Sequence, residues 1–379
     1  MGKRGNREGT ISRRKNGGWM AQYIVYTPDG RKRKTVYGKT RAEVSEKLTR
    51  AMADRDGGLV FDAGKMTVAE YLERWLADSA RGTVRKSTYD SYEGQLRRYV
   101  HPTLGRLALK KLTELHVQGL YRSMQDRGLS ARTVRYTHAV LRRALKQAVR
   151  WKYIPRNPCD DTDPPRVQRD EMRPLNQNQA RRLLSVAGAS GPNGEPDRFH
   201  ALYVLAVHTG MRPGELLALK WEDVELEAEI LSINRTLSMK GEFAAPKTAK
   251  SRRRIRLTAG SIAALKAHRK RQLEERMRLS SLWRDHGLVF PSTVGTPLNH
   301  RNLARAFKDL LKRASLPDTV RLYDLRHTCA TLLLARNVHP KYVQELLGHA
   351  SITLTLDTYS HVLPGMDGGA TSAMDEALG

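Results

Sequence analysis

A proline-rich segment between residues 154 and 174 limits the possible folds of this chain more than any other feature. Proline has no backbone N–H and a fixed φ, so such a segment can form neither a regular helix nor a central strand. It also contains the acidic run Asp160-Asp161-Thr162-Asp163. We therefore expect an interdomain linker with separately folded parts on either side. The prolines are Pro155, Pro158, Pro164, Pro165 and Pro174.

The region before the linker, from about Thr67 to Tyr153, is predicted to be helical throughout. Thr67 followed by Glu70 forms a capping box, and apolar residues then recur at helical spacing. Further helices are expected over about 87–99, over about 113–126 and from residue 130 onward. The last of these has a basic face, which makes Arg132 and Arg135 candidate DNA contacts. Taken alone, such a face is more often simply solvated.

The first 60 residues hold 15 Lys or Arg and six Asp or Glu. Residues 19–26 and 31–37 have the composition of two strands, joined by a turn at Thr27-Pro28-Asp29-Gly30, and a helix is expected from Thr40. A two-stranded ribbon of this kind can enter a DNA groove, but an edge strand guarded by lysines explains the charge equally well. The candidate DNA contacts here are Arg31, Arg33 and Lys34.

The whole chain carries a formal charge of +28, and nucleic acid is the polyanion best suited to balance it. A soluble protein that is merely basic is the alternative on composition alone. The only cysteines, Cys159 and Cys329, lack the spacing of a zinc site or a disulfide framework, which suits a reducing cytoplasm. No secretory signal is expected, and the longest apolar run, 201–207, is too short to span a bilayer.

The region after the linker is predicted to mix helices with a small sheet. Strands are expected over 230–237 and 252–257, with a basic hairpin between them. The predicted fold class is therefore a multidomain protein, mainly α with small β-sheets. The helices expected in this region lie near 177–186, 198–209, from 213, 261–278, 301–313, 325–336 and 340–347.

Two segments of this last region carry residues suited to binding a phosphate. Gly-Met-Arg-Pro places Arg212 at a helix start, where free backbone N–H groups already favour anions, and Glu215 could orient its guanidinium. The segment 245–252 places Lys247 at a hairpin tip, where an ammonium can reach a phosphate or give up a proton, with Lys250 as a nearby rival. An ordinary surface arginine and a solvated basic turn are the plainer alternatives.

Two further segments lie nearer the end of the chain. Residues 322–331 read Leu-Tyr-Asp-Leu-Arg-His-Thr-Cys-Ala-Thr and contain Arg326 and His327. Residues 346–351 read Leu-Leu-Gly-His-Ala-Ser, with Tyr359 ten residues after His349. In this order, the four segments resemble the catalytic domain of the tyrosine recombinases, the phage-type integrase family.

The resemblance implies a domain organisation for nearly the whole chain. An α+β arm-site DNA-binding domain is expected over 1–62 and an all-α core-binding domain over 63–154. After the linker at 155–174, a mixed α/β catalytic domain is expected over 175–365, followed by a tail at 366–379.

The resemblance also implies an activity: cutting and rejoining DNA at attachment sites through a 3′-phosphotyrosine intermediate, to integrate and excise a phage or other mobile element. Tyr359 would be the nucleophile, and Arg212 and Arg326 would clamp the scissile phosphate. Lys247 would protonate the leaving 5′-oxygen, and His349 would hydrogen-bond the phosphate or assist proton movement.

Other roles follow from the same resemblance. Glu215 would support the arginines and His327 would be structural, while Lys250 and Arg252 are candidate DNA contacts. The expected partners are double-stranded DNA at core and arm sites and a homotetramer on that DNA, with a host DNA-bending protein and an excision factor as further candidates. No metal, nucleotide cofactor or membrane is implied, and the expected location is the bacterial cytoplasm.

One position departs from the family pattern. The family usually has histidine three residues before the second arginine, and here that residue is Tyr323. A phenol can donate a hydrogen bond to phosphate but is a poor proton shuttle near neutral pH, because its reference pKa is about 10. Tyr323 is thus a candidate site residue and a rival nucleophile. Tyr359 is favoured as the nucleophile, because its distance from His349 fits the family pattern and Tyr323 occupies a recognised support position. The alternative functions are type IB topoisomerase-like relaxation and a non-catalytic DNA-binding regulator.

Overall fold

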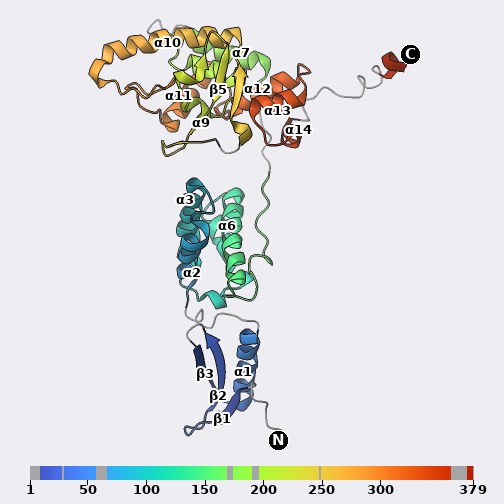
Figure 1. The fold of residues 1–379 in the computed structure, drawn as a ribbon. Coiled ribbons are helices and arrows are strands. Elements are labelled where there is room, and N and C mark those ends of the chain that lie inside the picture. The colour runs from blue at the N-terminus through green and yellow to red at the C-terminus, as the bar shows by residue number, and fades with distance from the viewer. Residues whose placement is uncertain are drawn as a thin grey trace. The chain divides into compact units, whose positions relative to one another are not determined.

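The computed structural model describes residues 9–27, 30–56, 66–168, 174–189, 196–246, 249–359 and 374–378. The chain divides into two compact units, residues 1–169 and 170–379 (Figure 1). It is mainly helical with small sheets, as the sequence predicted. Within the described ranges, no helix is both long and apolar enough to cross a bilayer.

The first unit begins with an antiparallel sheet in the order β1-β2-β3. Its strands are Thr10–Arg13, Trp19–Thr27 and Gly30–Gly38, and α1 spans Arg41–Asp56. The register pairs Thr27 with Gly30, so the predicted hairpin is present, although Pro28 and Asp29 lie outside the described residues. β1 was not predicted. The small core between sheet and helix consists of Ala21, Tyr23, Val25, Val44 and Leu48.

A helical bundle follows in the same unit. Its capping box at Thr67 is confirmed: the Thr67 backbone N–H donates to Glu70 at 2.8 Å, and the Glu70 N–H donates to the Thr67 hydroxyl at 3.2 Å. The bundle core is rich in leucine, with Trp75, Tyr71 and Tyr121 fully buried. The elements are α2 (Val68–Trp75), η2 (Leu76–Ala80), α3 (Lys86–Gln95), η3 (Leu96–Val100), α4 (His101–Leu104), η4 (Leu109–Lys111), α5 (Glu114–Asp126) and α6 (Ala131–Arg150).

The first part of the predicted linker is folded onto this bundle. Cys159 is buried in the bundle core, and the Asn157 side chain donates to the Arg142 carbonyl at 3.1 Å. Arg142 also pairs with Asp160 at 2.7 Å. This proline-containing segment is irregular. It packs on α6 through the hydrogen bond of Asn157 and the ion pair of Asp160.

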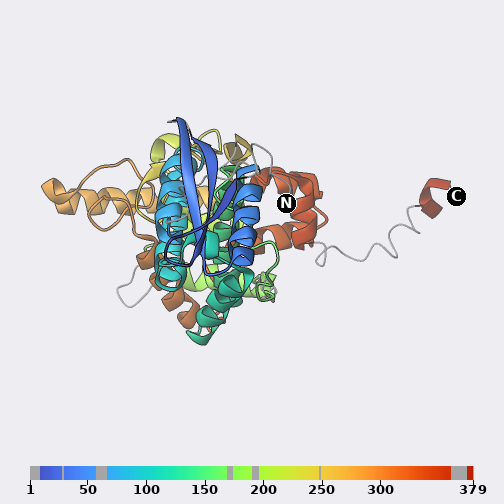
Figure 2. The same cartoon turned by 90° about the horizontal axis from the view of Figure 1, so that it is seen from below.

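The second unit surrounds α8 (His200–Thr209), a helix with eight of its ten residues buried. It contacts α7 (Gln177–Gly188), α9 (Pro213–Leu217), α10 (Ala259–Leu279) and α12 (Asp324–Leu334). Figure 2 shows α10, in orange, projecting from the body of its unit. The remaining helices are η5 (Trp221–Asp223), η6 (Ala249–Ser251), η7 (Ser280–Leu282), α11 (His300–Arg313), α13 (Pro340–Leu347) and α14 (Ile352–Tyr359).

The strands of the second unit differ from the predicted strand over 230–237. β5 (Ile230–Ile233) belongs to the sheet β4-β5-β8, whereas β6 (Thr236–Leu237) pairs with β7. The break has a physical reason, because Asn234 and Arg235 turn toward Asp223 and donate to its carboxylate at 2.9 and 2.5 Å. The other strands are β4 (Val224–Glu225), β7 (Phe243–Ala244) and β8 (Arg253–Arg256).

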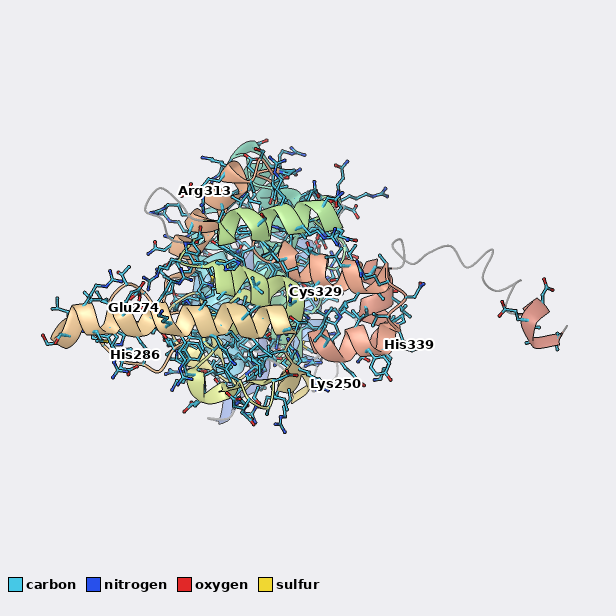
Figure 3. All side chains as sticks on the ribbon, turned by 90° about the horizontal axis from the view of Figure 1, so that it is seen from above. Lys250, Glu274, His286, Arg313, Cys329 and His339 are labelled. Carbon is cyan, nitrogen blue, oxygen red and sulfur yellow. The ribbon has the colours of Figure 1, made fainter. Side chains whose placement is uncertain are left out.

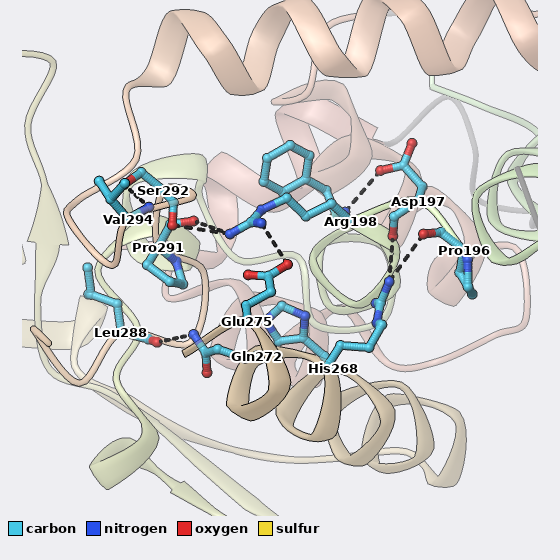
Figure 4. Close-up of polar contacts among 12 residues, drawn as sticks. Pro196, Asp197, Arg198, His268, Gln272, Glu275, Leu288, Pro291, Ser292 and Val294 are labelled. Atoms are coloured by element: carbon cyan, nitrogen blue, oxygen red, sulfur yellow. Dashed lines mark hydrogen bonds and ion pairs between the residues drawn. The ribbon is translucent and has the colours of Figure 1, made fainter. Parts of the chain in front are cut away.

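A partly buried polar network ties α10 to the body of the second unit. Figure 4 shows Arg198 between Glu275 on α10 and the carbonyl of Ser292, at 2.8 and 3.1 Å. His268, also on α10, lies 2.6 Å from the Val289 carbonyl through Nε2. Burial lowers the pKa of His268 to about 4.

Acid should therefore destabilise the second unit. His268 binds a proton more weakly when folded than when unfolded, so its contribution is intact above its ordinary pKa of about 6.5 and is lost as pH falls from there to about 4. The loss is on the order of 3 kcal/mol, measured as the pH dependence of denaturant unfolding. In His268→Gln the amide can still donate to Val289, so we expect a weaker acid dependence. An unchanged dependence would contradict this assignment.

Candidate active site

Arg326 is the buried centre of the site, with only 1% of its surface exposed. One terminal nitrogen donates to the Gly210 carbonyl and the other to the Leu347 carbonyl, both at 2.7 Å. These bonds use two of its five N–H donors and fix the guanidinium plane. Burial, with repulsion from nearby Arg212, lowers the pKa of Arg326 to about 10, so it stays charged at neutral pH.

Both carbonyls come from helix ends that require glycine. Gly210 caps the C-terminus of α8 and Gly348 caps that of α13, and each glycine is left-handed, with φ of +61° and +66°. A Cβ on Gly210 would lie 2.4 Å from the Leu347 side chain, and one on Gly348 would lie 2.9 Å from the Lys250 carbonyl. The glycines of the Gly-Met-Arg-Pro and Leu-Gly-His segments thus let these two helix ends approach Arg326.

Glu215 holds two more arginines in place. Its carboxylate accepts from the Arg212 side chain at 2.8 Å and from the Arg253 side chain at 3.1 Å, and it caps the Arg212 backbone N–H at 3.0 Å. Burial opposes its ionisation, but the attraction of Arg253 and the bond from Arg212 prevail, so the pKa of Glu215 lies below its ordinary value. The predicted supporting carboxylate therefore contacts Arg212 as expected.

Arg253 was not among the predicted site residues. It lies on β8 with 7% of its side chain exposed, and its Nε donates to the Leu346 carbonyl at 2.5 Å. β8 pairs Ile255 with Leu231 and Arg253 with Ile233, so Arg253 lies on the inward face of the strand. The alternation with Ile255 is a sequence signal that could have identified Arg253 among its basic neighbours.

His349 follows Gly348 and is buried next to the arginines. Its Nδ1 lies 2.9 Å from the Thr355 hydroxyl on α14. Burial, with repulsion from Arg326 and Arg212, lowers the pKa of His349 to about 4, so the ring is neutral at physiological pH. A neutral imidazole can donate one hydrogen bond without adding charge.

Tyr359 ends α14, with 2% of its surface exposed. Its hydroxyl lies 2.7 Å from Nδ1 of His327 on α12, one residue after Arg326. Burial raises the pKa of Tyr359 well above its ordinary range, only partly offset by Arg326, so the phenol is protonated at neutral pH. The rival Tyr323 is 41% exposed, and its ring meets the His327 ring edge-on at a centroid distance of 5.3 Å.

The predicted lysine cannot be placed, because Lys247 lies outside the described residues. Lys250 donates from Nζ to the carbonyl of Ala350, at 2.9 Å. Figure 3 labels Lys250 near the C-terminal helices, and it also labels Cys329, which is buried. Lys250 therefore lies at the edge of the site, where it contacts the residue that follows His349.

The described part of the site carries three guanidinium groups and one carboxylate, beside a neutral His349. This excess of positive charge favours an anion with several oxygens, as fixed arginines bind phosphate. No group of three or more His, Cys, Asp or Glu suited to hold a metal occurs among the described residues. The arrangement has the parts needed for phosphoryl transfer to a tyrosine: a cationic clamp, a phenol and imidazoles for hydrogen bonds or proton movement.

The profile of the phage integrase family matches residues 173–365, and that of the phage integrase N-terminal SAM-like domain matches residues 67–125. The chain belongs to the phage integrase family. The family resemblance inferred from the sequence is thereby confirmed.

Relatives in this family match over most of their length. An integrase of Streptomyces ambofaciens is 30% identical over 369 residues, which cover 93% of this chain and 92% of the relative. A XerC-like tyrosine recombinase of Caldanaerobacter subterraneus subsp. tengcongensis is 29% identical over 366 residues, covering 91% and 92%.

Solved integrase structures share the fold. The Tn1549 transposon integrase in complex with a circular intermediate DNA superposes with a TM-score of 0.69 and 22% identity, covering 82% of this chain and 99% of that chain. A lambda integrase tetramer bound to a Holliday junction gives a TM-score of 0.59 at 20% identity, covering 96% and 99%.

The predicted DNA contacts of this integrase lie on different elements. Arg132 and Arg135 are exposed on α6, and Arg252 is exposed just before β8. On β3, Arg33 is exposed and Lys34 is partly buried opposite Tyr23, on the face toward α1. The structure does not describe the side chain of Arg31.

Replacing Arg253 by methionine should destabilise the catalytic unit by about 3 kcal/mol, because it leaves Glu215 buried with only Arg212 as an ionic partner. The midpoint of its denaturant unfolding measures this. Arg254→Met is the matched control, since Arg254 is 64% exposed on the same strand, and it should change stability by at most about 0.5 kcal/mol. Equal effects of the two substitutions would contradict the burial argument.

Proposed function

We propose that this protein is a site-specific DNA recombinase that uses Tyr359 to cut and rejoin DNA at attachment sites of a phage or other mobile element. One observation carries the proposal: the Tyr359 hydroxyl lies 2.7 Å from His327, the residue that follows the buried clamp arginine Arg326. The charge of Arg326 also acts on the Tyr359 phenol, which supports a nucleophile and a phosphate clamp in the same subunit.

The reaction conserves the phosphodiester energy without a nucleotide. The Tyr359 oxygen attacks phosphorus, a 3′-phosphotyrosine bond forms, and the bond to the 5′-oxygen breaks. Arg326 and Arg212 stabilise the charge that develops on the non-bridging oxygens, and His349 donates a hydrogen bond to one of them. Lys247 protonates the leaving 5′-oxygen. Attack by a 5′-hydroxyl then reverses these steps and rejoins the strand.

The same proposal assigns roles to the rest of the chain. Residues 1–62 bind arm sites through Arg31, Arg33 and Lys34, and residues 63–154 bind the core site through Arg132 and Arg135. Residues 155–174 connect them to the catalytic domain, 175–365, where Lys250 and Arg252 contact the DNA backbone and Tyr323 contacts the phosphate. Residues 366–379 form a tail.

The assembly is proposed from relatives. Lambda integrase was solved as a dimer on a core site and as a tetramer on a Holliday junction. We expect the same assembly here, a homotetramer on paired DNA sites in the bacterial cytoplasm, assisted by a host bending protein and an excision factor. Because phosphate contacts dominate such binding, affinity should fall steeply with salt.

A nicked suicide substrate from the ends of the source element tests the proposal. Loss of the short strand fragment after cleavage traps the covalent complex, which denaturing electrophoresis detects. We expect a trapped adduct with this DNA and no relaxation of a supercoiled plasmid that lacks the sites. Relaxation of that plasmid would indicate a topoisomerase, and specific binding without an adduct would indicate a non-catalytic regulator.

A further inference from the structure

The contacts of His327 suggest that this residue takes part in the reaction together with Tyr359. Its Nδ1 lies 2.7 Å from the Tyr359 hydroxyl, and the two rings are 5.7 Å apart between centroids. We propose that His327 is the general base that accepts the phenolic proton of Tyr359 as the phenol attacks the DNA phosphorus. This inference rests on the proposed function, in which Tyr359 is the nucleophile.

The reaction requires a base at this position. Tyr359 is 2% exposed, and its burial raises the pKa of the phenol, so bulk water neither reaches nor ionises it readily. A neutral phenol is a weak nucleophile, and its proton must leave as the new P–O bond forms. Among the described residues, only the His327 side chain lies within hydrogen-bond distance of the Tyr359 hydroxyl.

His327 has the protonation state that this role needs. Burial lowers the pKa of His327 below its ordinary value, with Arg326 and Arg321 adding to the effect and Asp324 opposing it. The ring is therefore neutral at pH 7. When its hydrogen is on Nε2, Nδ1 presents a lone pair to the phenol.

The other candidate bases are less suitable. Nδ1 of His349 lies at the Thr355 hydroxyl, not at Tyr359. Tyr323 stands where the family usually has histidine, but a phenol has no ring nitrogen with which to accept the proton. Its ring instead meets His327 edge-on and limits how that imidazole can turn. In this chain the proposed base therefore lies four residues after Tyr323, which is about one helical turn further along the chain.

Every proton is accounted for in both the cleavage and the rejoining step. On cleavage, the phenolic proton moves to Nδ1 of His327, the tyrosine oxygen bonds to phosphorus, and the 5′-oxygen leaves with a proton from a separate acid. On rejoining, the 5′-hydroxyl attacks, the phenolate leaves, and the His327 imidazolium returns the proton. No oxidant, metal or nucleotide takes part.

The test compares rates of adduct formation on the nicked substrate across pH. His327→Asn places an amide oxygen near the position of Nδ1, so it can accept the hydrogen bond but not the proton. We expect adduct formation at pH 7 to slow by about 10²–10⁴-fold, with unchanged DNA affinity. His286→Asn, at an exposed histidine of the same unit, is the control and should retain the wild-type rate.

The pH profile separates proton transfer from positioning. The wild-type rate should fall as pH drops below the ordinary histidine pKa of about 6.5, because protonation then blocks Nδ1. In His327→Asn this acidic decrease should disappear, and the rate should rise with pH as the phenol ionises. The charged and titratable groups that act on His327 or contact it, and must be kept unchanged in this comparison, are Arg321, Tyr323, Asp324, Arg326, His349 and Tyr359.

A chemical rescue completes the test. With 3,5-difluorotyrosine at position 359, whose phenol is more acidic, the loss caused by His327→Asn should be much smaller. An Asn variant with the wild-type rate, or a slow variant with the wild-type pH profile and no rescue, would overturn the role of His327. An adduct that still forms in Tyr359→Phe would instead overturn the proposed function, so the two failures are distinguishable.

Discussion

A Tyr359→Phe variant should bind attachment-site DNA with wild-type affinity and form no covalent adduct, a loss of about 10⁴-fold or more in cleavage rate. The substitution removes the nucleophilic oxygen and its contact with His327, while the ring can still fill the buried space at the end of α14. Electrophoresis of trapped complexes measures the adduct, and a mobility-shift titration measures affinity.

Tyr323→Phe is the matched control. Tyr323 is 41% exposed and contacts His327 through its ring, which phenylalanine retains. We expect a decrease of no more than about tenfold from loss of one phosphate hydrogen bond. An adduct that persists in Tyr359→Phe and vanishes in Tyr323→Phe would make Tyr323 the nucleophile.

Arg326→Lys should lower the cleavage rate by about 10²–10³-fold, although the charge is kept. The guanidinium spans two carbonyls, Gly210 and Leu347, at 2.7 Å each, and its other N–H donors can then face the phosphate. An ammonium is not planar. If it binds one of the carbonyls, it cannot at the same time bind the other carbonyl and the phosphate in the same arrangement.

The control for this variant is Arg336→Lys, at an exposed arginine beyond the end of the same helix that donates to Gln177. It should cleave DNA at the wild-type rate. If Arg326→Lys also cleaves at that rate, a point charge is sufficient and the clamp geometry is unimportant.

Much of the fold was accessible from local signals in the sequence. The capping box at Thr67 and the helical spacing after it placed α2 correctly, because side-chain capping and an apolar face are short-range features. The hairpin of β2 and β3 followed from strand composition and its turn. Three of the four motif segments pointed to Arg212, Glu215, Arg326, His349 and Tyr359 through their residue types and order. The structure brings these residues together, since Glu215 contacts Arg212 and the Arg326 charge acts on His349 and Tyr359.

The remaining features depend on tertiary contacts. The alternating, β-branched sequence Ile352–Tyr359 gives no helical period, yet it forms α14 because it packs on α12 and α13. The alternation with Ile255 places Arg253 on one face of the strand, but the pairing of β8 with β5 decides that this face points inward. The contact between His327 and Tyr359 joins residues 32 apart, which no spacing rule predicts.

The most direct measurement identifies the residue that carries the DNA. Wild-type protein trapped on the nicked substrate is digested with protease and nuclease, and mass spectrometry locates the remaining nucleotide. We expect it on the peptide that contains Tyr359, joined through a 3′-phosphate. A nucleotide on any other residue, Tyr323 included, would contradict the assignment of the nucleophile.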